Sequence, residues 1–394
     1  MINQQFFLPA LGIVNALGCG VDEIAQGLFA GDTRGLVLEN GWLPDGPARV
    51  GGVKHALPEI PLHLADFACR NNQLLLAALQ QIHTQVEQAI AQYGYHRIGV
   101  VIGTSTSGID ESEHAFADYQ QSGIMPADYR YVRQELGSPA IYLSKLLNLK
   151  GPAYAISTAC TSSAKAFQSA RNLLQHGLCD AVLVGGVDTL CKTTVNGFAS
   201  LESTSLDISN PMSRNRNGIN IGEGAALFLM TKEPSDIVLL GVGESSDAYH
   251  VSAPQPEGLG AEAAMLAALK DAKLHAKDID YLNLHATATI KNDEMESRAV
   301  SRVFPNQVPC SGTKPLIGHT LGAAGANELA FCWMALKHNH LPPHIWDGEA
   351  DNNLTALHFT QVGDQFHQSS ARVCMSNSFA FGGSNVSLII GDRQ

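Results

Sequence analysis

Three side chains in this sequence have the types and local settings that acyl-transfer chemistry needs. Cys160 stands between an apolar run and a helix-like run. At a helix N-terminus, unpaired N–H groups and the helix dipole favour the thiolate, the form of cysteine that attacks carbonyl carbons. His285 ends another apolar run and His319 lies in a glycine-bounded loop. Neutral imidazoles in such places can donate hydrogen bonds to a developing negative charge.

The segments around these residues single them out from the other cysteines and histidines of the chain. They are Ser157-Thr158-Ala159-Cys160-Thr161-Ser162-Ser163-Ala164, His285-Ala286-Thr287-Ala288-Thr289 and Lys314-Pro315-Leu316-Ile317-Gly318-His319. Two more are Gly222-Glu223-Gly224 and Asn377-Ser378-Phe379-Ala380-Phe381-Gly382-Gly383-Ser384-Asn385. In this order, the five segments resemble the β-ketoacyl-[acyl-carrier-protein] synthases, Cys-His-His condensing enzymes of the thiolase-like superfamily. The resemblance covers nearly the whole chain.

The resemblance implies a decarboxylative Claisen condensation in fatty acid or polyketide synthesis. Cys160 would hold the acyl chain as a thioester, and His285 and His319 would stabilise the enolate that malonyl-carrier protein forms on losing CO₂. Either histidine could also help to activate Cys160. Lys314 and Glu328 match the family's supporting lysine and buried glutamate. The resemblance implies no metal and no cofactor beyond the phosphopantetheine of the carrier.

Other residues match the family's substrate contacts. Thr287 and Thr289 match threonines that bind the pantetheine arm, and in an extended segment they would face the same side. The resemblance implies that the N–H of Phe379 forms the oxyanion hole with that of Cys160 and that its ring gates the acyl pocket. Ala286 and Ala380 stand where the family usually has glycine.

The hydrophobic pattern predicts the elements that position these residues. We expect strands at 98–102, 153–157, 181–184, 279–284, 372–376 and 386–390, and helices at 161–176, 260–273 and 322–339. Asn292 or Asp293 would cap the helix after His285. The apolar stretch Phe6 to Leu17 has no basic lead and is interpreted as a first strand and turn, not a signal peptide. The strand–helix–strand order around Cys160 places it at the carboxyl end of a parallel strand.

The expected fold class is α/β. The resemblance implies a thiolase-like fold with two similar halves in a five-layered α-β-α-β-α core. We place the N-terminal half with the nucleophile at 1–235 and the C-terminal half with both histidines at 236–394. The residues themselves show no convincing repeat between the halves, and no low-complexity linker separates them.

Composition excludes several other classes. Hydrophobic residues make up 45% of the 394 residues and charged residues 16%, which indicates a well-buried globule. A net charge of −12 argues against nucleic-acid binding, and no apolar run reaches membrane-spanning length. The eight cysteines form no CxxC pair, so we expect no zinc site, mostly buried thiols, and a reducing, cytoplasmic compartment.

The expected partners are an acyl carrier protein and a second ketosynthase-like subunit. The carrier is acidic, so this acidic chain needs a local basic patch, for which the candidates are Arg70, Arg130, Arg133, Arg214 and Arg216. The family forms dimers, so a homodimer or a heterodimer with a chain-length factor is expected. Pro211-Met212-Ser213 and the 124–136 segment depart from the family pattern. These departures favour a specialised type II polyketide or aryl polyene ketosynthase.

Alternatives fit the sequence less well. A thiolase acting on coenzyme A esters needs a second cysteine in the C-terminal glycine-rich motif, where this chain has Phe379 and Gly382-Gly383, with Cys374 on the preceding strand. The initiating synthases have asparagine in place of one histidine, which His319 disfavours. A non-catalytic chain-length partner usually loses the nucleophile. The sequence contains no GxSxG or HExxH hydrolase motif.

Overall fold

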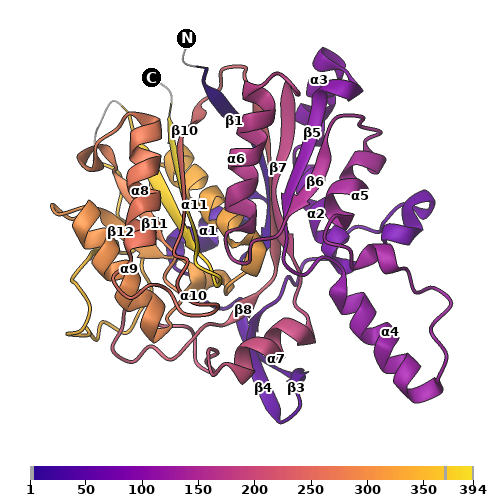
Figure 1. Ribbon diagram of the computed structural model, residues 1–394, viewed down its shortest axis with the longest axis horizontal. Helices are drawn as coiled ribbons and strands as arrows, with labels where there is room; N and C mark the ends of the chain where they lie inside the picture. Colours follow the sequence, from indigo (N-terminus) through magenta and orange to yellow (C-terminus); the bar gives the residue numbers. More distant parts are fainter. Residues whose placement is uncertain (1–3, 368–370, 393–394) are drawn as a thin grey trace.

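The computed structural model describes residues 4–367 and 371–392 and consists of two α/β halves (Figure 1). The first half contains β1 (Phe6–Asn15), β2 (Gly18–Cys19), α1 (Val21–Ala30), β3 (Leu36–Leu43), β4 (Gly46–Gly51), α2 (Arg70–Gln81), α3 (His83–Tyr93), β5 (Ile98–Gly103), α4 (Ile109–Ser122), α5 (Ser138–Leu146), β6 (Ala153–Ile156), α6 (Ser162–Gln175), β7 (Ala181–Asp188), α7 (Lys192–Ser200), β8 (Ile221–Gly222) and β9 (Gly224–Thr231). The second contains β10 (Ile237–Ser246), α8 (Leu259–Ala272), β11 (Tyr281–Leu284), α9 (Ile290–Val303), β12 (Pro309–Gly312), α10 (Lys314–Ile317), α11 (Ala324–His338), β13 (His358–Phe359), β14 (Val373–Phe379) and β15 (Ser384–Asp392).

The two halves repeat one strand pattern. The strand order is β1-β9-β7-β5-β6 in the first half and β10-β15-β14-β11-β12 in the second. In each half, the first two pairings are antiparallel and the next two are parallel. The repeat therefore lies in the topology, although the residues show none, and the expected pair of similar halves is confirmed. The start of β1 also pairs with β10, which joins both half-sheets into one twelve-stranded sheet.

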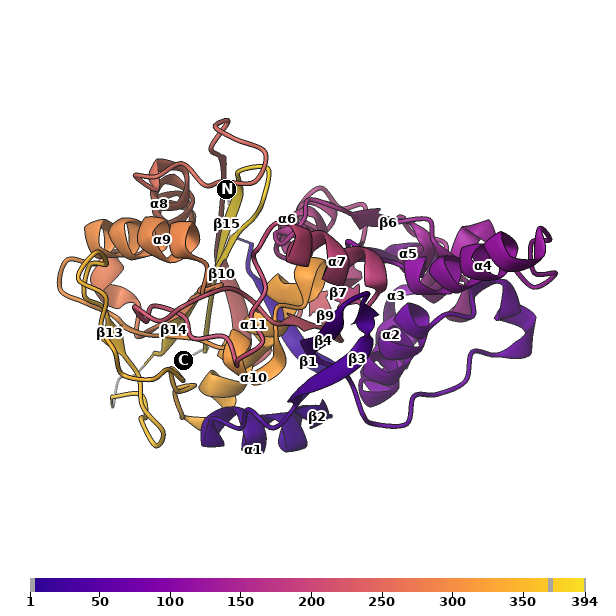
Figure 2. The ribbon, with the colours of Figure 1, turned by 90° about the horizontal axis from the view of Figure 1, so that it is seen from below.

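The helices form three layers around the half-sheets, as Figures 1 and 2 show. Helices α6 and α11 pack on each other between the half-sheets, where the largest apolar cluster lies. Helices α2 and α5 cover the outer face of the first half-sheet, and α8 and α9 cover that of the second. This arrangement is the expected five-layered α-β-α-β-α core. The division at residues 235 and 236 stays a prediction, and its outer ends, 1–3 and 393–394, lie outside the described residues.

Most predicted elements are confirmed. Helix α6 has Thr161 and His176 as its caps, and β14 and β15 extend the two predicted C-terminal strands. The predicted cap of the helix after His285 is wrong, because α9 begins at Ile290 with Thr289 as its N-cap. In the described part of the chain, we find no helix with the length and apolarity that crossing a bilayer requires.

The parallel strands place the functional segments at one end of the sheet. Strand β6 leads to Cys160, β11 leads directly to His285, and β12 leads to Lys314 at the start of α10. Because these strands run the same way within each half, their carboxyl ends bring the following loops together, as expected for α/β sheets. The central helices α6 and α11 begin beside these loops.

Candidate active site

Cys160 lies in a tight turn between β6 and α6. Ala159 before it has a φ of +53°, a left-handed conformation that is uncommon for alanine. The hydroxyl of Ser162 ties this turn, because it accepts from the N–H of Thr158 at 2.9 Å and donates to the carbonyl of Ala159 at 2.6 Å. Cys160 is only 6% exposed, and it lines a cavity of about 320 Å³.

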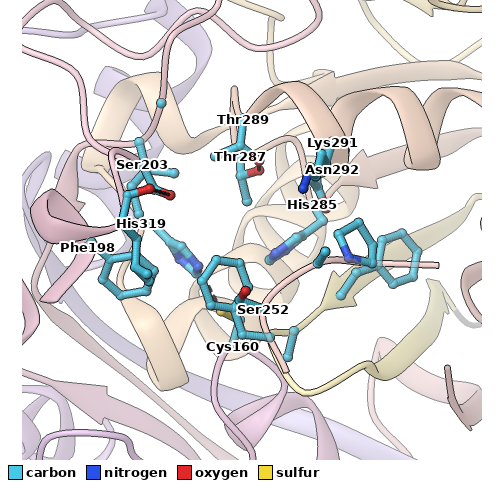
Figure 3. A pocket seen from close by; sticks show the side chains of 18 of the residues that line it. Cys160, Phe198, Ser203, Ser252, His285, Thr287, Thr289, Lys291, Asn292 and His319 are labelled. Carbon is cyan, nitrogen blue, oxygen red and sulfur yellow. Dashed lines mark hydrogen bonds between the residues drawn. The ribbon is translucent and has the colours of Figure 1, made fainter. Parts of the chain in front are cut away.

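The structure brings Cys160, His285 and His319 together (Figure 3). The Nε2 atom of His319 lies 3.0 Å from the sulfur of Cys160. The two imidazoles are nearly perpendicular, with centroids 5.5 Å apart. The cysteine sulfur and one nitrogen of each ring all lie within 4.8 Å of one another. All three side chains line the same cavity, so a substrate carbonyl there can contact each of them.

Lys314 and Glu328 form a buried ion pair behind His285. The Lys314 ammonium also donates to the carbonyl oxygen of His285 and lies 3.4 Å from its Nδ1 atom. An ammonium group has only donors, so Nδ1 of His285 must accept and the ring proton must be on Nε2. Lys314 therefore positions His285 and selects its tautomer.

Burial sets the protonation states of the site. Burial and the nearby Lys314 charge hold the pKa values of His285 and His319 well below the usual histidine value, so both imidazoles are neutral. Burial also raises the pKa of Cys160 to about 11, although the Lys314 charge opposes the rise. We expected a helix N-terminus to favour the thiolate. Desolvation of the sulfur outweighs that effect here, so the resting group is the thiol.

Glu296 is a functional candidate that the sequence analysis missed. It lies on α9, and its two carboxylate oxygens accept hydrogen bonds from the backbone N–H groups of His285 and Ala286, each at 2.7 Å. Burial raises the pKa of Glu296, and the two amides oppose the rise because they bind the ionised carboxylate. Glu296 thus fixes the backbone at His285 and Ala286. The signal available in the sequence was a glutamate on the apolar face of a predicted helix.

Thr287 and Thr289 lie side by side at the cavity, with their hydroxyl oxygens 2.9 Å apart. Their segment is not the extended strand that we expected, since Ala286 and Ala288 have φ values of +39° and +59°. The left-handed conformation of Ala286 explains why glycine suits this position. Gly312 makes room for Ala286, because a Cβ at residue 312 would lie 2.4 Å from the Cβ of Ala286.

The amide at the cysteine sulfur belongs to Phe381, two residues after the predicted Phe379. The backbone N–H groups of Phe381 and of Cys160 itself hydrogen-bond to the sulfur. The ring of Phe379 instead packs edge-to-face with the imidazole of His285, with centroids 6.1 Å apart. The ring of Phe381 packs on Phe198, with centroids 5.6 Å apart, and both rings line the cavity. The motif contains two phenylalanines, and the amide that the resemblance implied at Phe379 is that of Phe381.

The arginines that we predicted for carrier docking differ in their surroundings. Arg216 is buried and pairs with Asp351 at 2.5 Å, so it holds the fold together. Arg70 pairs with the buried Glu223 and is half-buried. The remaining three reach the surface, as exposed Arg130 and Arg214 and half-buried Arg133.

Comparisons with known proteins identify this arrangement. Residues 47–235 match the N-terminal domain of β-ketoacyl synthases, and residues 237–346 match their C-terminal domain. Nodulation protein E from Rhizobium meliloti (strain 1021) is 33% identical over 403 residues, which cover 98% of this chain and 99% of that protein. The chain belongs to the β-ketoacyl synthase family.

Further relatives confirm the condensing chemistry of this ketosynthase. It is 28% identical to 3-oxoacyl-[acyl-carrier-protein] synthase 2 from Coxiella burnetii, with 99% of each chain covered. It is 47% identical to a ketosynthase (ApeO) from Xenorhabdus doucetiae that was solved in complex with its chain length factor. That match has a TM-score of 0.95 and covers 99% of this chain and 98% of the other. The thiolase-like fold and the acyltransferase class are therefore as predicted.

Proposed function

We propose that Cys160 carries the growing acyl chain and that His319 activates it. The observation that carries this proposal is the 3.0 Å contact between His319 Nε2 and the Cys160 sulfur. A thiol with a pKa of about 11 needs a base, and neutral His319 can accept its proton. The sulfur then attacks the carrier thioester carbonyl. The expelled pantetheine thiolate takes the proton back from His319.

The amides of Cys160 and Phe381 are the proposed oxyanion hole. They already point at the sulfur, so the oxygen of a tetrahedral intermediate bonded to that sulfur lies within their reach. Thr287 and Thr289 are proposed to bind the pantetheine arm, because their adjacent hydroxyls line the cavity that leads to Cys160.

His285 is the proposed donor to the enolate in the second half-reaction. Its Nε2–H is free for substrate because Lys314 occupies Nδ1. As the malonyl group loses CO₂, the negative charge moves to the thioester oxygen, which accepts from His285. Once Cys160 is acylated, its sulfur no longer donates a proton to His319, and the neutral imidazole that has moved its single proton from Nδ1 to Nε2 can donate from Nε2 as well. The carbanion attacks the acyl thioester and Cys160 leaves as thiolate, so the product is two carbons longer. The thiolate then takes up the one proton that the reaction consumes from solvent water.

A chain-length factor is the proposed partner subunit. The ApeO ketosynthase, to which this chain is similar, was solved with one. Strand β6 is the last strand in the sheet order and is half-buried, so its edge is open for pairing. Helix α4 and the segment after it project from the same side of the molecule (Figures 1 and 2). They expose large apolar side chains, namely Phe116, Tyr119, Ile124, Tyr131 and Leu136.

The substrates are proposed to be malonyl and polyketide or polyene chains on an acyl carrier protein, as expected for a type II polyketide or aryl polyene system. No cofactor beyond the carrier's phosphopantetheine enters this proposal. All eight cysteines are free in the structure, which fits a reducing cytoplasm as the proposed compartment.

Elongation by the co-expressed subunits tests the proposal. The ketosynthase is purified alone and with its chain-length factor, and native mass gives the assembly. Carrier-bound acyl and malonyl groups are then supplied. We expect a heterodimer that yields product two carbons longer, and none with Cys160→Ala. Elongation by the Cys160→Ala heterodimer would contradict the chemistry, and an active homodimer would contradict the partner.

A further inference from the structure

The segment 211–218, here called the brace loop, holds Ala288, the residue between Thr287 and Thr289 at the cavity. It includes the Pro211-Met212-Ser213 run that departs from the family pattern. The N–H of Gly218 donates to the carbonyl of Ala288 at 2.9 Å. The N–H of Met212 donates to Asp293 at 2.8 Å, and the same carboxylate accepts from the N–H of Ala288. Both backbone groups of Ala288 thus connect to this loop.

The brace loop in turn depends on His344. The Nε2 atom of this buried imidazole donates to the carbonyl of Pro211 at 3.1 Å. Its Nδ1 atom accepts from the N–H of Gly312 at 3.0 Å, and its ring stacks on Phe359 with centroids 4.1 Å apart. Both ring nitrogens form hydrogen bonds, one as donor and one as acceptor, so the imidazole has one tautomer and one orientation. Gly312 is the residue whose missing side chain makes room for Ala286.

A second anchor lies three residues further along the chain. The Asp347 carboxylate accepts from Ser213 at 2.8 Å and from Asn210 and Asn215, also at 2.8 Å. These bonds fix both ends of the Pro211-Met212 turn. Met212 has a φ of +64° and Ala288 a φ of +59°, so both residues are held in an uncommon conformation. Such conformations persist where the surroundings over-determine them.

We propose that His344 is a positioning residue for pantetheine binding. It holds the brace loop against Ala288 and thereby sets the spacing of Thr287 and Thr289 at the cavity. This inference rests on the proposed role of the two threonines. His344 contacts neither Cys160 nor the other catalytic groups through any described hydrogen bond, so its loss weakens binding of the pantetheine arm and leaves the reactivity of the thiol unchanged.

Binding of carrier protein with and without its phosphopantetheine arm tests this inference. The variant His344→Phe keeps the stacking on Phe359 and loses both hydrogen bonds. We expect its affinity for holo-carrier to fall roughly 3- to 10-fold, which corresponds to the loss of about one hydrogen bond between the threonines and the pantetheine arm. Its affinity for apo-carrier should stay unchanged. The alkylation rate of Cys160 by iodoacetamide also stays at the wild-type value. His358→Phe, on the exposed neighbouring strand β13, is the matched control and behaves as wild type.

Two comparisons keep the test decisive. His344→Gln retains one acceptor and one donor, so it is expected to fold and to recover part of the holo-carrier affinity. If His344→Phe fails to fold, His344→Leu, which also loses both hydrogen bonds, replaces it, and a wild-type holo-carrier affinity in that variant overturns the inference. Equal losses for holo- and apo-carrier, or a parallel loss of alkylation, also overturn it. Because binding needs no turnover, a wild-type enzyme that binds holo-carrier without condensing would contradict the proposed function alone.

Discussion

The ammonium of Lys314 lies 3.4 Å from Nδ1 of His285 in a site where burial already disfavours charge. This contact does two things. It leaves Nε2 as the protonated nitrogen that faces the substrate, and its positive charge lowers the pKa of the ring. His285 can therefore act as a neutral hydrogen-bond donor at pH values where an ordinary histidine begins to protonate.

Removing the Lys314 charge should introduce a pH dependence. In the double variant Lys314→Met, Glu328→Gln, no buried charge is left unpaired, and the pKa values of His285 and His319 rise towards the usual value. Burial still lowers both pKa values in the variant, but without the Lys314 charge the imidazoles protonate at a higher pH than in the wild type. Malonyl-carrier decarboxylation should therefore begin to fall at a higher pH in the variant as the solution is made more acidic. Parallel pH profiles for both proteins would refute the role given to Lys314.

Glu296→Gln should disturb the loop that carries His285. A glutamine places an NH₂ group against one of the two amides that now donate to the carboxylate. One hydrogen bond is lost and two donors face each other, at an expected cost of about 1–3 kcal/mol. We expect decarboxylation to slow at least about tenfold, and a steady-state assay with malonyl-carrier measures it. Glu257→Gln changes an exposed glutamate that lies outside the cavity lining; it is the control and should retain activity.

His344 should make stability depend on pH in a definite direction. Burial lowers its pKa from the usual 6.5 to about 4. Between these values the unfolded chain binds a proton that the folded protein does not. The stabilisation that the neutral His344 ring contributes to the folded protein is therefore fully present above pH 6.5 and is lost as pH falls towards 4. The loss amounts to about 3 kcal/mol at most.

Thermal midpoints measured against pH check this prediction. The curve for His344→Gln should be flatter than the wild-type curve in the acid range, because the variant has no imidazole to protonate. His285 and His319 are present in both proteins, so their contribution cancels in the difference. His55→Gln changes an exposed histidine and should reproduce the wild-type slope. A His344→Gln curve as steep as the wild-type curve would contradict the assignment.

Lys291 should attract the acidic carrier and its phosphate. It is exposed and lines the mouth of the cavity at the start of α9. Lys291→Glu should raise KM for carrier-bound substrates several-fold, and added salt should shrink the effect because it screens exposed charges. The turnover number should change little. Lys277→Glu makes the same charge change outside the cavity lining and serves as the control. A salt-independent effect would argue for lost packing instead.

The sequence was sufficient to locate the candidate catalytic side chains, because each lies in a short loop that follows a strand or a short helix. Cys160, His285 and His319 carry family-like neighbours, and the hydrophobic pattern located β6 and β11. The ion pair of Lys314 with Glu328 also followed from the resemblance. The repeat between halves could not be read from the residues, since it is a repeat of strand order and direction.

What the sequence did not predict depends on packing between distant segments. The pKa of Cys160 depends on how deeply its sulfur is buried, and a local motif does not report this. The role of Glu296 could not be predicted from a sequence motif, because its partners are backbone amides, which every residue except proline has. The sequence did not show that Arg216 is buried, because its partner Asp351 lies far away in the chain and only the fold brings the two together. The left-handed Ala286 and Ala288 bring the threonines together by a path that no alternation rule anticipates.

The mass of the intact protein after incubation with acyl-carrier proteins tests the central claim most directly. We expect a gain equal to the acyl group in the wild type and in Cys19→Ser, which lacks a half-exposed thiol outside the cavity. We expect no gain in Cys160→Ser under the same conditions. The chain-length factor is co-expressed in every case, so a missing partner cannot account for a negative result. Equal acylation of Cys160→Ser and wild type, or no acylation of any wild-type sample, would contradict the assignment of Cys160 as the nucleophile.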